Sequence, residues 1–180
     1  SKTTLVIPTY NRHPFLLRFL QFYSLYDYKF EFLILDSSSD KITNNVLLDY
    51  IKKDNIEYKK YNQEIFIVDK IADGFRYIDT PFTVLCADDD FIIPTGIVES
   101  QNFLLENKNY VSAHGLYFNH TSADDVQKKG FTIVPLYQKG GSSEQDSATK
   151  RLNAYLSGPI SNVFYAVHRT ELLQLIWTET

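Results

Sequence analysis

Short apolar runs alternate along the first half of the chain with longer segments in which apolar residues recur at helical spacing. The short runs are bounded by polar or turn-forming residues and cover positions 3–7, 30–35, 56–61 and 83–87. Runs of this kind predict buried strands. The longer segments predict an amphipathic helix at positions 14–26, a helix at 46–53, and a loop followed by a helix at 65–77. Strands that alternate with helices in this way favour an α/β fold with a parallel, doubly wound sheet.

Proline and asparagine residues predict where the first elements begin and end. Pro8 is expected to stop the first strand, because proline has no amide hydrogen to donate to a neighbouring strand. Asn11 is a candidate N-cap for the following helix, and Pro14 falls in the first turn of that helix. We therefore expect a strand, a short loop over residues 9–12, and then a helix.

The second half of the chain has a different pattern. A helix is predicted from Pro94 to Asn107, and strand-like runs follow at positions 110–118, 131–137 and 160–168. The polar segment 121–130 and the Gly140–Gly141 pair predict loops. Two further helices are predicted, at positions 144–156 and 169–177. We expect this half to contribute a smaller antiparallel portion to the fold.

Polar clusters follow three of the predicted strands. They lie at residues 8–12, 36–40 and 88–90. In doubly wound sheets, ligands bind in the crevice beyond the carboxyl ends of the strands. The three clusters are therefore expected to converge on one crevice, and this convergence is the main functional signal in the sequence.

The third cluster consists of three consecutive carboxylates, Asp88, Asp89 and Asp90, directly after a buried strand. Like charges this close repel one another, and burying them is costly unless they are paired or bound to a metal. Mg²⁺ or Mn²⁺ would relieve the repulsion, because hard cations accept carboxylate oxygens and keep sites open for phosphate. The alternative is a solvated acidic turn.

Charge and cysteine content exclude several classes of protein. The net charge of −4 gives no basic surface of the kind that binds nucleic acid. The single cysteine, Cys86, excludes an internal disulfide framework and is typical of a reducing compartment. We expect no transmembrane segment and no signal peptide in this chain. The expected location is the cytoplasm, or the cytoplasmic face of a membrane through parts outside this chain.

Several of these segments resemble a known family in their order and spacing. They are Leu5–Arg12 (LVIPTYNR), Ile34–Asp40 (ILDSSSD), Lys70–Gly74, Asp88–Asp90 as a D-x-D motif, and Val163–Arg169. Over almost its whole length the chain resembles the family 2-like glycosyltransferases of the GT-A fold. The resemblance implies a mostly parallel sheet flanked by helices. It also implies a nucleotide-binding half at residues 1–93 and an acceptor-side half at residues 94–180.

The resemblance further implies roles for individual residues. Asp36 would hydrogen-bond the nucleobase, typically uracil, and Asp90 would ligate the Mn²⁺ or Mg²⁺ that holds the diphosphate. Asp88 would lie near the ribose and share in the metal site. The complete set of implied nucleotide-binding residues is Pro8, Thr9, Tyr10, Arg12, Asp36, Lys70, Asp88 and Asp89.

An inverting transferase also needs a carboxylate base that deprotonates the acceptor hydroxyl. In the family this base follows the late helix, close to or just past residue 180. Glu179 lies in that range, whereas Glu144 and Asp146 are candidates by residue type alone. Since the chain has no Met and its last residues have the pattern of an uncapped helix, we expect a fragment of a longer protein.

The sequence therefore predicts a metal-dependent enzyme that moves a sugar from a nucleotide-diphosphate donor, most simply a UDP-sugar, to a glycan, a lipid-linked glycan or another hydroxyl acceptor. Transfer is expected to invert the anomeric centre, and the expected setting is polysaccharide biosynthesis. One alternative is a binding module for sugar nucleotides or glycans that has no catalytic base. Another is a nucleotidyltransferase, although residues 8–12 are not the Gly- and Lys/Arg-rich phosphate loop such an enzyme normally shows.

Overall fold

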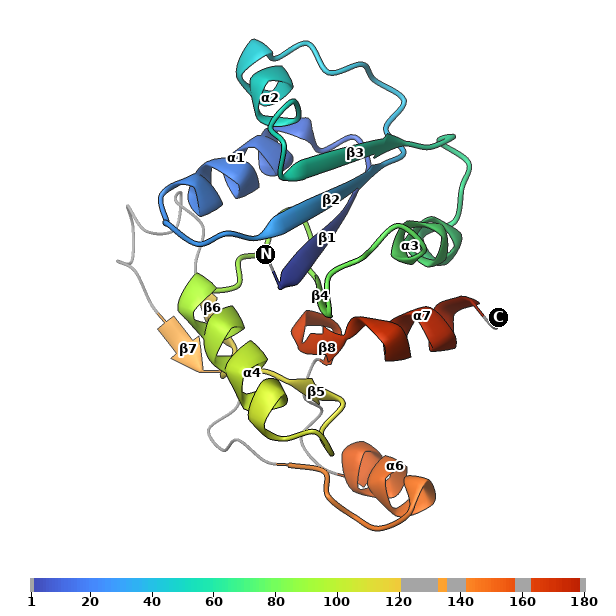
Figure 1. Cartoon of the computed structure of the whole chain (residues 1–180). Helices are drawn as coiled ribbons and strands as arrows, with labels where there is room; N and C mark the ends of the chain where they lie inside the picture. The colour runs from blue at the N-terminus through green and yellow to red at the C-terminus, as the bar shows by residue number, and fades with distance from the viewer. Residues whose placement is uncertain (1, 121–132, 136–141, 158–162, 179–180) are drawn as a thin grey trace. The chain divides into compact units, whose positions relative to one another are not determined.

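The computed structural model describes residues 2–120, 133–135, 142–157 and 163–178 (Figure 1). The chain divides into two compact units. The first unit combines Ser1–His114 with Phe164–Thr180, and the second is Gly115–Val163. This division does not follow the predicted nucleotide-binding and acceptor-side halves, because the end of the chain returns to the first unit. The functional halves stay a prediction.

The first unit contains a six-stranded sheet with the order β3-β2-β1-β4-β8-β5. Four strands are parallel neighbours, namely β1 (Thr3–Thr9), β2 (Glu31–Asp36), β3 (Ile56–Lys60) and β4 (Phe82–Leu85). Two strands from later in the chain extend the sheet with antiparallel pairings, β8 (Val167–Arg169) against β4 and β5 (Ser112–Ala113) against β8. The predicted α/β fold, mostly parallel with an antiparallel portion, is confirmed.

Helices cover both faces of this sheet because its strands are apolar on both faces. Leu5 and Ile7 of β1 face the cluster that includes α1 (His13–Ser24), α2 (Asn45–Tyr50) and α4 (Pro94–Glu106). Val6, between them, faces the cluster that includes α3 (Ile67–Phe75) and α7 (Thr170–Thr178). Figure 1 shows α1 and α2 on one side of the parallel strands and α3 on the other. The two-sided burial explains the nearly continuous apolar runs of these strands.

The second unit is smaller. The antiparallel strands β6 (Phe118–His120) and β7 (Ile133–Pro135) pair with each other, and α6 spans Ala148–Ser157. The predicted strand at 110–118 is instead two short strands, β5 and β6. Within the predicted strand at 131–137 the structure describes only residues 133–135, which form β7, and the predicted loops at 121–130 and Gly140–Gly141 lie outside the described residues. The described part of the strand-like run at 160–168 is a 3-10 turn, η1 (Val163–Tyr165), followed by Ala166 and β8.

Pro8 does not end the first strand, contrary to the prediction. β1 runs on to Thr9, and Pro8 is level with Leu35 of β2. Alternate residues of a strand direct their backbone groups to the same neighbour, and the carbonyl of Val6 accepts from the amide of Cys86 on the β4 side. The missing amide of Pro8 therefore points to the same side, beyond the last residue of β4. A proline is tolerated at such a locally unpaired edge.

None of the described helices combines the length and the hydropathy that crossing a lipid bilayer requires.

Gly74 of α3 gives a test of how tightly this helix packs on the sheet. A Cβ at position 74 would lie 2.7 and 2.8 Å from the two terminal methyl carbons of Leu35. Because Leu35 is fully buried, it has little room to move. We expect Gly74→Ala to lower the free energy of unfolding by about 1–3 kcal/mol, through overpacking.

Gly96 of α4 supplies the matched control, since a Cβ there would meet nothing within 4 Å. Gly96→Ala should raise stability by about 0.5–1 kcal/mol, because alanine loses less conformational entropy in a helix. Urea denaturation of both variants measures the two changes. Equal effects from both substitutions would contradict the close contact of Gly74 with Leu35.

Candidate functional site

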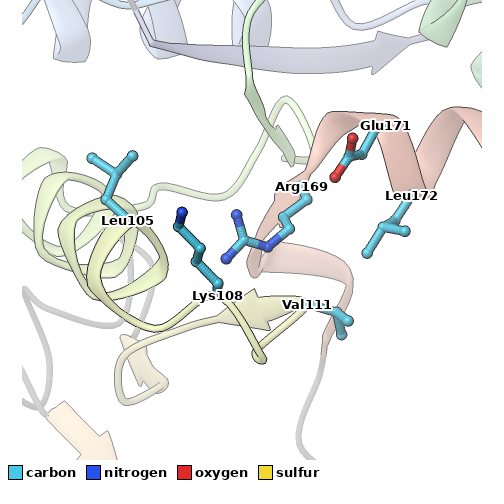
Figure 2. A pocket seen from close by; sticks show the side chains of 6 residues that line it. All are labelled: Leu105, Lys108, Val111, Arg169, Glu171 and Leu172. Atoms are coloured by element: carbon cyan, nitrogen blue, oxygen red, sulfur yellow. The ribbon is translucent and has the colours of Figure 1, made fainter.

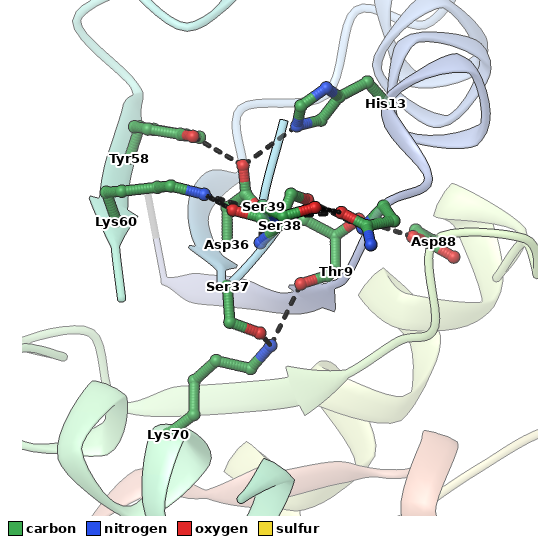
Figure 3. Close-up of polar contacts among 11 residues, drawn as sticks. Thr9, His13, Asp36, Ser37, Ser38, Ser39, Tyr58, Lys60, Lys70 and Asp88 are labelled. Carbon is green, nitrogen blue, oxygen red and sulfur yellow. Dashed lines mark hydrogen bonds and ion pairs between the residues drawn. The ribbon is translucent and has the colours of Figure 1, made fainter. Parts of the chain in front are cut away.

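The loops that follow β1, β2 and β4 lie against one another at the carboxyl edge of the sheet. The hydroxyl of Thr9 donates to Oδ2 of Asp88 at 2.6 Å. The amide of Asn11 donates to the hydroxyl of Ser38 at 2.7 Å, and the amide of Ser37 donates to the carbonyl of Thr9 at 3.2 Å. The predicted convergence of the three polar clusters is therefore present in the structure (Figure 3).

Asn11 joins two of these loops instead of capping the helix, so its predicted role as the N-cap is wrong. Helix α1 begins at His13 with Arg12 at the N-cap position, which makes no side-chain capping bond. Asn11 adopts a left-handed backbone conformation with φ of 54°, which asparagine tolerates better than most residues. Its side-chain oxygen accepts from the amide of Ser39 at 2.9 Å. The residue thus ties the loop after β1 to the loop after β2.

Lys70 supports the ends of β1 and β2 from α3. Its ammonium group donates to the carbonyl of Thr9 at 3.0 Å and to the hydroxyl of Ser37 at 2.8 Å, as Figure 3 shows. The side chain is only 2 % exposed. Burial lowers the pKa of Lys70, and the negative charges of Asp36 and Asp88 oppose that shift. In this conformation the ammonium group of Lys70 holds the backbone of Thr9 and the side chain of Ser37 in place and does not point to solvent.

Asp36, at the end of β2, is fully buried and lies among four donors (Figure 3). The amide of Ser38 donates to Oδ1 at 2.7 Å, and Nζ of Lys60 lies 3.7 Å from the same oxygen. The hydroxyl of Tyr58 donates to Oδ2 at 2.5 Å, and Nε2 of His13 lies 3.0 Å from it. Both carboxylate oxygens are therefore already engaged by the protein.

These donors set the charge of the group. Burial raises the pKa of Asp36, but the hydrogen bonds from Ser38, Tyr58 and His13 lower it by more, so that the net pKa lies below its ordinary value. The pKa of Tyr58 is raised, first by burial and then by Asp36. The pair is thus an ionised carboxylate and a neutral phenol that donates to it.

The sequence analysis did not single out His13, Tyr58 or Lys60. A signal existed for two of them, because Tyr58 and Lys60 are two residues apart in β3 and share one face. The pairing of β3 with β2 also makes Lys60 level with Asp36. No local signal marked His13, whose partner lies 23 residues further along the chain.

The first two carboxylates of the acidic triplet are paired with one arginine of α1's N-terminus. Asp88 is 2 % exposed, and its Oδ1 lies 3.3 Å from Nη1 of Arg12. The other terminal nitrogen of Arg12 forms an ion pair with Asp89. Burial raises the pKa of Asp88, whereas Thr9 and Arg12 partly offset that effect. The hydrogen bond to Asp89 raises the pKa of Arg12.

Two aromatic rings support the arginines beside this loop. The guanidinium of Arg12 lies 4.6 Å from the ring centre of Phe15, and that of Arg18 lies 5.0 Å from the same ring. Arg18 also lies 5.4 Å from the ring centre of Phe91 and donates to the carbonyl of Asp89 at 3.4 Å. Cations over aromatic faces are attracted to them. Helix α1 therefore fixes the loop after β4 through several contacts.

Asp90 has different surroundings from the other two carboxylates. It is exposed, and the hydroxyl of Tyr165 donates to its Oδ2. Its backbone is held separately, because its amide donates to the carbonyl of Ala87 at 3.3 Å and its carbonyl lies 3.7 Å from the thiol of Cys86. Of the triplet, Asp90 is therefore the carboxylate that is open to a ligand.

These residues fit a divalent cation that is shared with a phosphate group. Within the part of the chain that the structure describes, no three His, Cys, Asp or Glu side chains gather into a metal site. Both oxygens of Asp88 are engaged by Thr9 and Arg12, whereas Asp90 is exposed. Mg²⁺ is commonly held by one or two carboxylates together with substrate phosphates. A cation held by the protein alone fits less well.

The three candidate bases are not brought to this cluster by any described contact. Glu144 and Asp146 belong to the second unit, and both are exposed. Asp146 forms an ion pair of 3.0 Å with Lys150, four residues later. Glu179 lies outside the described residues. The role of these residues as a base stays a prediction.

A pocket of about 440 Å³ lies elsewhere in the first unit (Figure 2). Lys108, Arg169 and Glu171 line it together with three apolar side chains, those of Leu105, Val111 and Leu172. The guanidinium of Arg169 donates to backbone carbonyls at the end of α4, including that of Leu104 at 2.7 Å. Arg169 is level with the first residue of β4, so this pocket lies toward the opposite edge of the sheet from the acidic loop.

Comparison with known protein families identifies the family of this chain. The model of glycosyl transferase family 2 matches residues 4–168, which is most of the chain. The chain belongs to glycosyl transferase family 2. The match confirms the resemblance found in the sequence, and it includes the loops after β1, β2 and β4 that form the site.

Solved structures share this family fold. S. aureus TarS 1–349 in complex with UDP-GlcNAc superposes with a TM-score of 0.62 at 16 % identity, covering 98 % of this chain and 47 % of TarS 1–349. A second crystal structure of S. aureus TarS 1–349 gives a TM-score of 0.61 at 15 % identity, covering 98 % of this chain and 49 % of that one. The chain therefore spans about half the length of these structures.

A third structure is the mannosyltransferase PcManGT from Pyrobaculum calidifontis in complex with GDP-Man and Mn²⁺. The match covers 62 % of this chain and 34 % of the PcManGT chain, with a TM-score of 0.49 at 15 % identity. This likeness is too low to support an argument. No curated protein matches the sequence.

The surroundings of Asp36 predict a pH-dependent contribution to stability. Because its pKa is lowered from 3.8 in the folded state, the unfolded chain binds the proton more readily. The stabilisation is thus fully present above the unfolded value and is lost as the pH falls through the folded pKa. Asp36→Asn should lower the free energy of unfolding at pH 7 by about 1.5–3 kcal/mol, since charge-assisted hydrogen bonds are lost. The difference from the unaltered protein should shrink below about pH 4.

Urea denaturation at a series of pH values measures this difference. The exposed Asp40 of the same loop gives the control, and Asp40→Asn should change stability by no more than about 0.5 kcal/mol. A difference for Asp36→Asn that stays constant down to pH 2 would show that its charge does not matter to the fold.

Proposed function

We propose that this chain forms the donor-binding part of a metal-dependent glycosyltransferase, which moves a sugar from a UDP-sugar to a hydroxyl acceptor and inverts the anomeric centre. The proposal depends on one observation above the others. In a member of glycosyl transferase family 2, the loop after β4 buries Asp88 against Thr9 and Arg12 and leaves Asp90 exposed. An exposed carboxylate at the carboxyl edge of the sheet suits a cation that holds a diphosphate.

The nucleoside would lie in the crevice beside β1 and β2. Tyr10 is 50 % exposed next to the end of β1, so its ring is free to contact a base. Pro8 and Thr9 would shape the adjoining backbone, and Arg12 and Asp89, which form an ion pair, would lie at the rim of that crevice. The UDP and UDP-GlcNAc complexes of S. aureus TarS support uridine diphosphate as the carrier.

Asp36 takes part in this proposal as the group that organises the base pocket. Its oxygens already accept from Tyr58 and Ser38, with His13 and Lys60 close by. A direct bond from uracil to Asp36 would therefore require one of these donors to move. Lys60 is more exposed than His13 and makes the longer contact with Asp36, so it is the donor that a base would displace most easily.

The cation would be held by Asp90, with Asp88 as its buried neighbour. Its chemistry is that of a Lewis acid, which stabilises the negative charge that develops on the diphosphate as the sugar bond breaks. Thr9 and Arg12 keep the loop in the shape that presents Asp90. The residues of this chain would thus position the donor. Because few carboxylates at this site are available to a metal, binding of the metal would depend on the phosphates of the nucleotide.

The acceptor would be a glycan or a lipid-linked glycan, whose hydroxyl attacks the anomeric carbon after losing a proton to a carboxylate base. Glu144, Asp146 and Glu179 remain the candidate bases. A chain that binds sugar nucleotide without transferring the sugar would instead be the binding module considered above.

The metal assignment predicts how UDP and Mn²⁺ depend on each other. Calorimetric titration of UDP should show an affinity at least about tenfold higher with Mn²⁺ than with chelator, which corresponds to about 1.4 kcal/mol. Mn²⁺ alone should bind weakly, because the phosphates complete its coordination. Asp90→Asn should remove the effect of the metal and leave the binding of UDP in chelator unchanged.

Asp54→Asn, at an exposed turn after α2, is the matched control and should behave like the unaltered protein. GDP and CDP titrated in the same way identify the base that the site prefers. Equal UDP affinity with Mn²⁺ and with chelator would refute the metal assignment.

The role of Asp36 predicts a loss that depends on the base. Asp36→Ala should weaken UDP by about tenfold or more while weakening inorganic diphosphate much less, since the diphosphate lies at the acidic loop. Tyr58→Phe, which removes one donor to Asp36, should show a smaller loss with the same selectivity and keeps the carboxylate in place. Equal losses for UDP and diphosphate would count against a base pocket at Asp36.

A further inference from the structure

We propose that Tyr165 is a positioning residue whose phenol orients the carboxylate of Asp90 for the divalent cation. The inference rests on the proposed function, because it assumes that Asp90 holds a metal beside the diphosphate. It adds a residue from the end of the chain, about 75 positions away in sequence, to a site otherwise formed by the first half.

The sheet register explains how Tyr165 reaches the acidic loop. β8 runs antiparallel to β4, and Val167 is level with Val84. Tyr165 precedes Val167 by two residues, at the end of η1, so the chain brings it toward the carboxyl end of β4, where the acidic loop follows. Ala166, between Tyr165 and β8, is fully buried, so the segment is held against the core. The same pairing that adds β8 to the sheet thus delivers a phenol to the end of β4.

The contact itself restricts one carboxylate oxygen of Asp90. The hydroxyl of Tyr165 donates to Oδ2, and within the described residues no other side chain is recorded as bonding this carboxylate. The hydroxyl of Tyr165 supplies the hydrogen of this contact, because an ionised carboxylate can only accept. With Oδ2 held, Oδ1 is left to face a cation.

The backbone contacts of Asp90 do not perform this task. Its amide bonds Ala87 and its carbonyl lies near the thiol of Cys86, which together fix the turn but leave the side chain free to rotate. Carboxylates that bind metals are usually held by a hydrogen bond from a neighbouring group, and removing such a group commonly costs 10- to 100-fold in metal affinity. Tyr165 is the group in this position.

The type of donor also matters. Arg12 forms ion pairs with Asp88 and Asp89, whereas Tyr165 gives Asp90 a hydrogen bond without a positive charge. A neutral donor fixes the direction of the carboxylate and leaves its negative charge for the cation. An arginine at position 165 would compete with the metal, which a tyrosine does not.

The test compares Tyr165→Phe with the unaltered protein. Titration of UDP with Mn²⁺ and with chelator, and of Mn²⁺ into the UDP complex followed by the electron paramagnetic resonance signal of free Mn²⁺, give the two affinities separately. Tyr165→Phe should weaken Mn²⁺ by about tenfold or more and leave UDP binding in chelator unchanged. Unchanged binding in chelator also reports that the variant is folded.

Tyr61→Phe is the matched control, because Tyr61 makes the same kind of bond, to Asp73 at 2.8 Å, away from the acidic triplet. It should leave both affinities unchanged. In a double-mutant cycle, Asp90→Asn combined with Tyr165→Phe should lose no more Mn²⁺ affinity than Asp90→Asn alone, since Tyr165 acts through Asp90.

Three results would overturn the inference while the metal assignment stands. These are an unchanged Mn²⁺ affinity for Tyr165→Phe, additive losses in the double variant, or an equal loss for Tyr61→Phe. Failure of the proposed function is recognised separately, in the unaltered protein, as UDP binding that does not depend on Mn²⁺. In that case the role of Tyr165 is refuted as well.

Discussion

A carboxylate that is removed from water must find donors in the protein, and two such groups determine the arrangement of this site. Asp36 and Asp88 are buried at the ends of β2 and β4, the strands on either side of β1. Thr9, the last residue of β1, and Arg12, in the loop after it, donate to Asp88. The buried ammonium of Lys70 interacts electrostatically with both carboxylates. The loops after three strands are thus fixed together because two buried charges must be compensated. The positions of the exposed residues in these loops depend on these buried contacts.

The architecture of the first unit was largely predictable from the sequence. The spacing of apolar residues within a segment depends on which face of that helix or strand is buried. Each segment therefore indicates its own secondary structure without information from the rest of the chain. The predicted strands and helices up to Asn107 are all present, with ends shifted by a few residues. The convergence of the three polar clusters was predictable too, because the carboxyl ends of parallel strands share one edge of the sheet. These two predictions, the order of the elements and the convergence of the clusters, needed no knowledge of strand register, and both were confirmed.

The partners of individual side chains were not predictable in the same way. His13 looked like an isolated histidine, because the carboxylate it contacts belongs to another strand. Tyr165 reaches Asp90 only through the pairing of β8 with β4, which the sequence does not encode locally. Pro8 remained in its strand because β4 ends before it, and Asn11 became a bridge between loops because Ser39 lies opposite. Each of these outcomes depends on how distant segments align, and a single sequence contains no direct record of that alignment.

The three adjacent carboxylates of the acidic loop differ in the charge they present. Arg12 lies against the first two, whereas Asp90 faces a neutral phenol, so the three carboxylates and the one guanidinium together carry a net charge of −2. One divalent cation bound at Asp90 would cancel this net charge. A stretch of sequence that should repel phosphate could therefore accept it, and because Arg12 already offsets one of the three negative charges, a single divalent cation is enough.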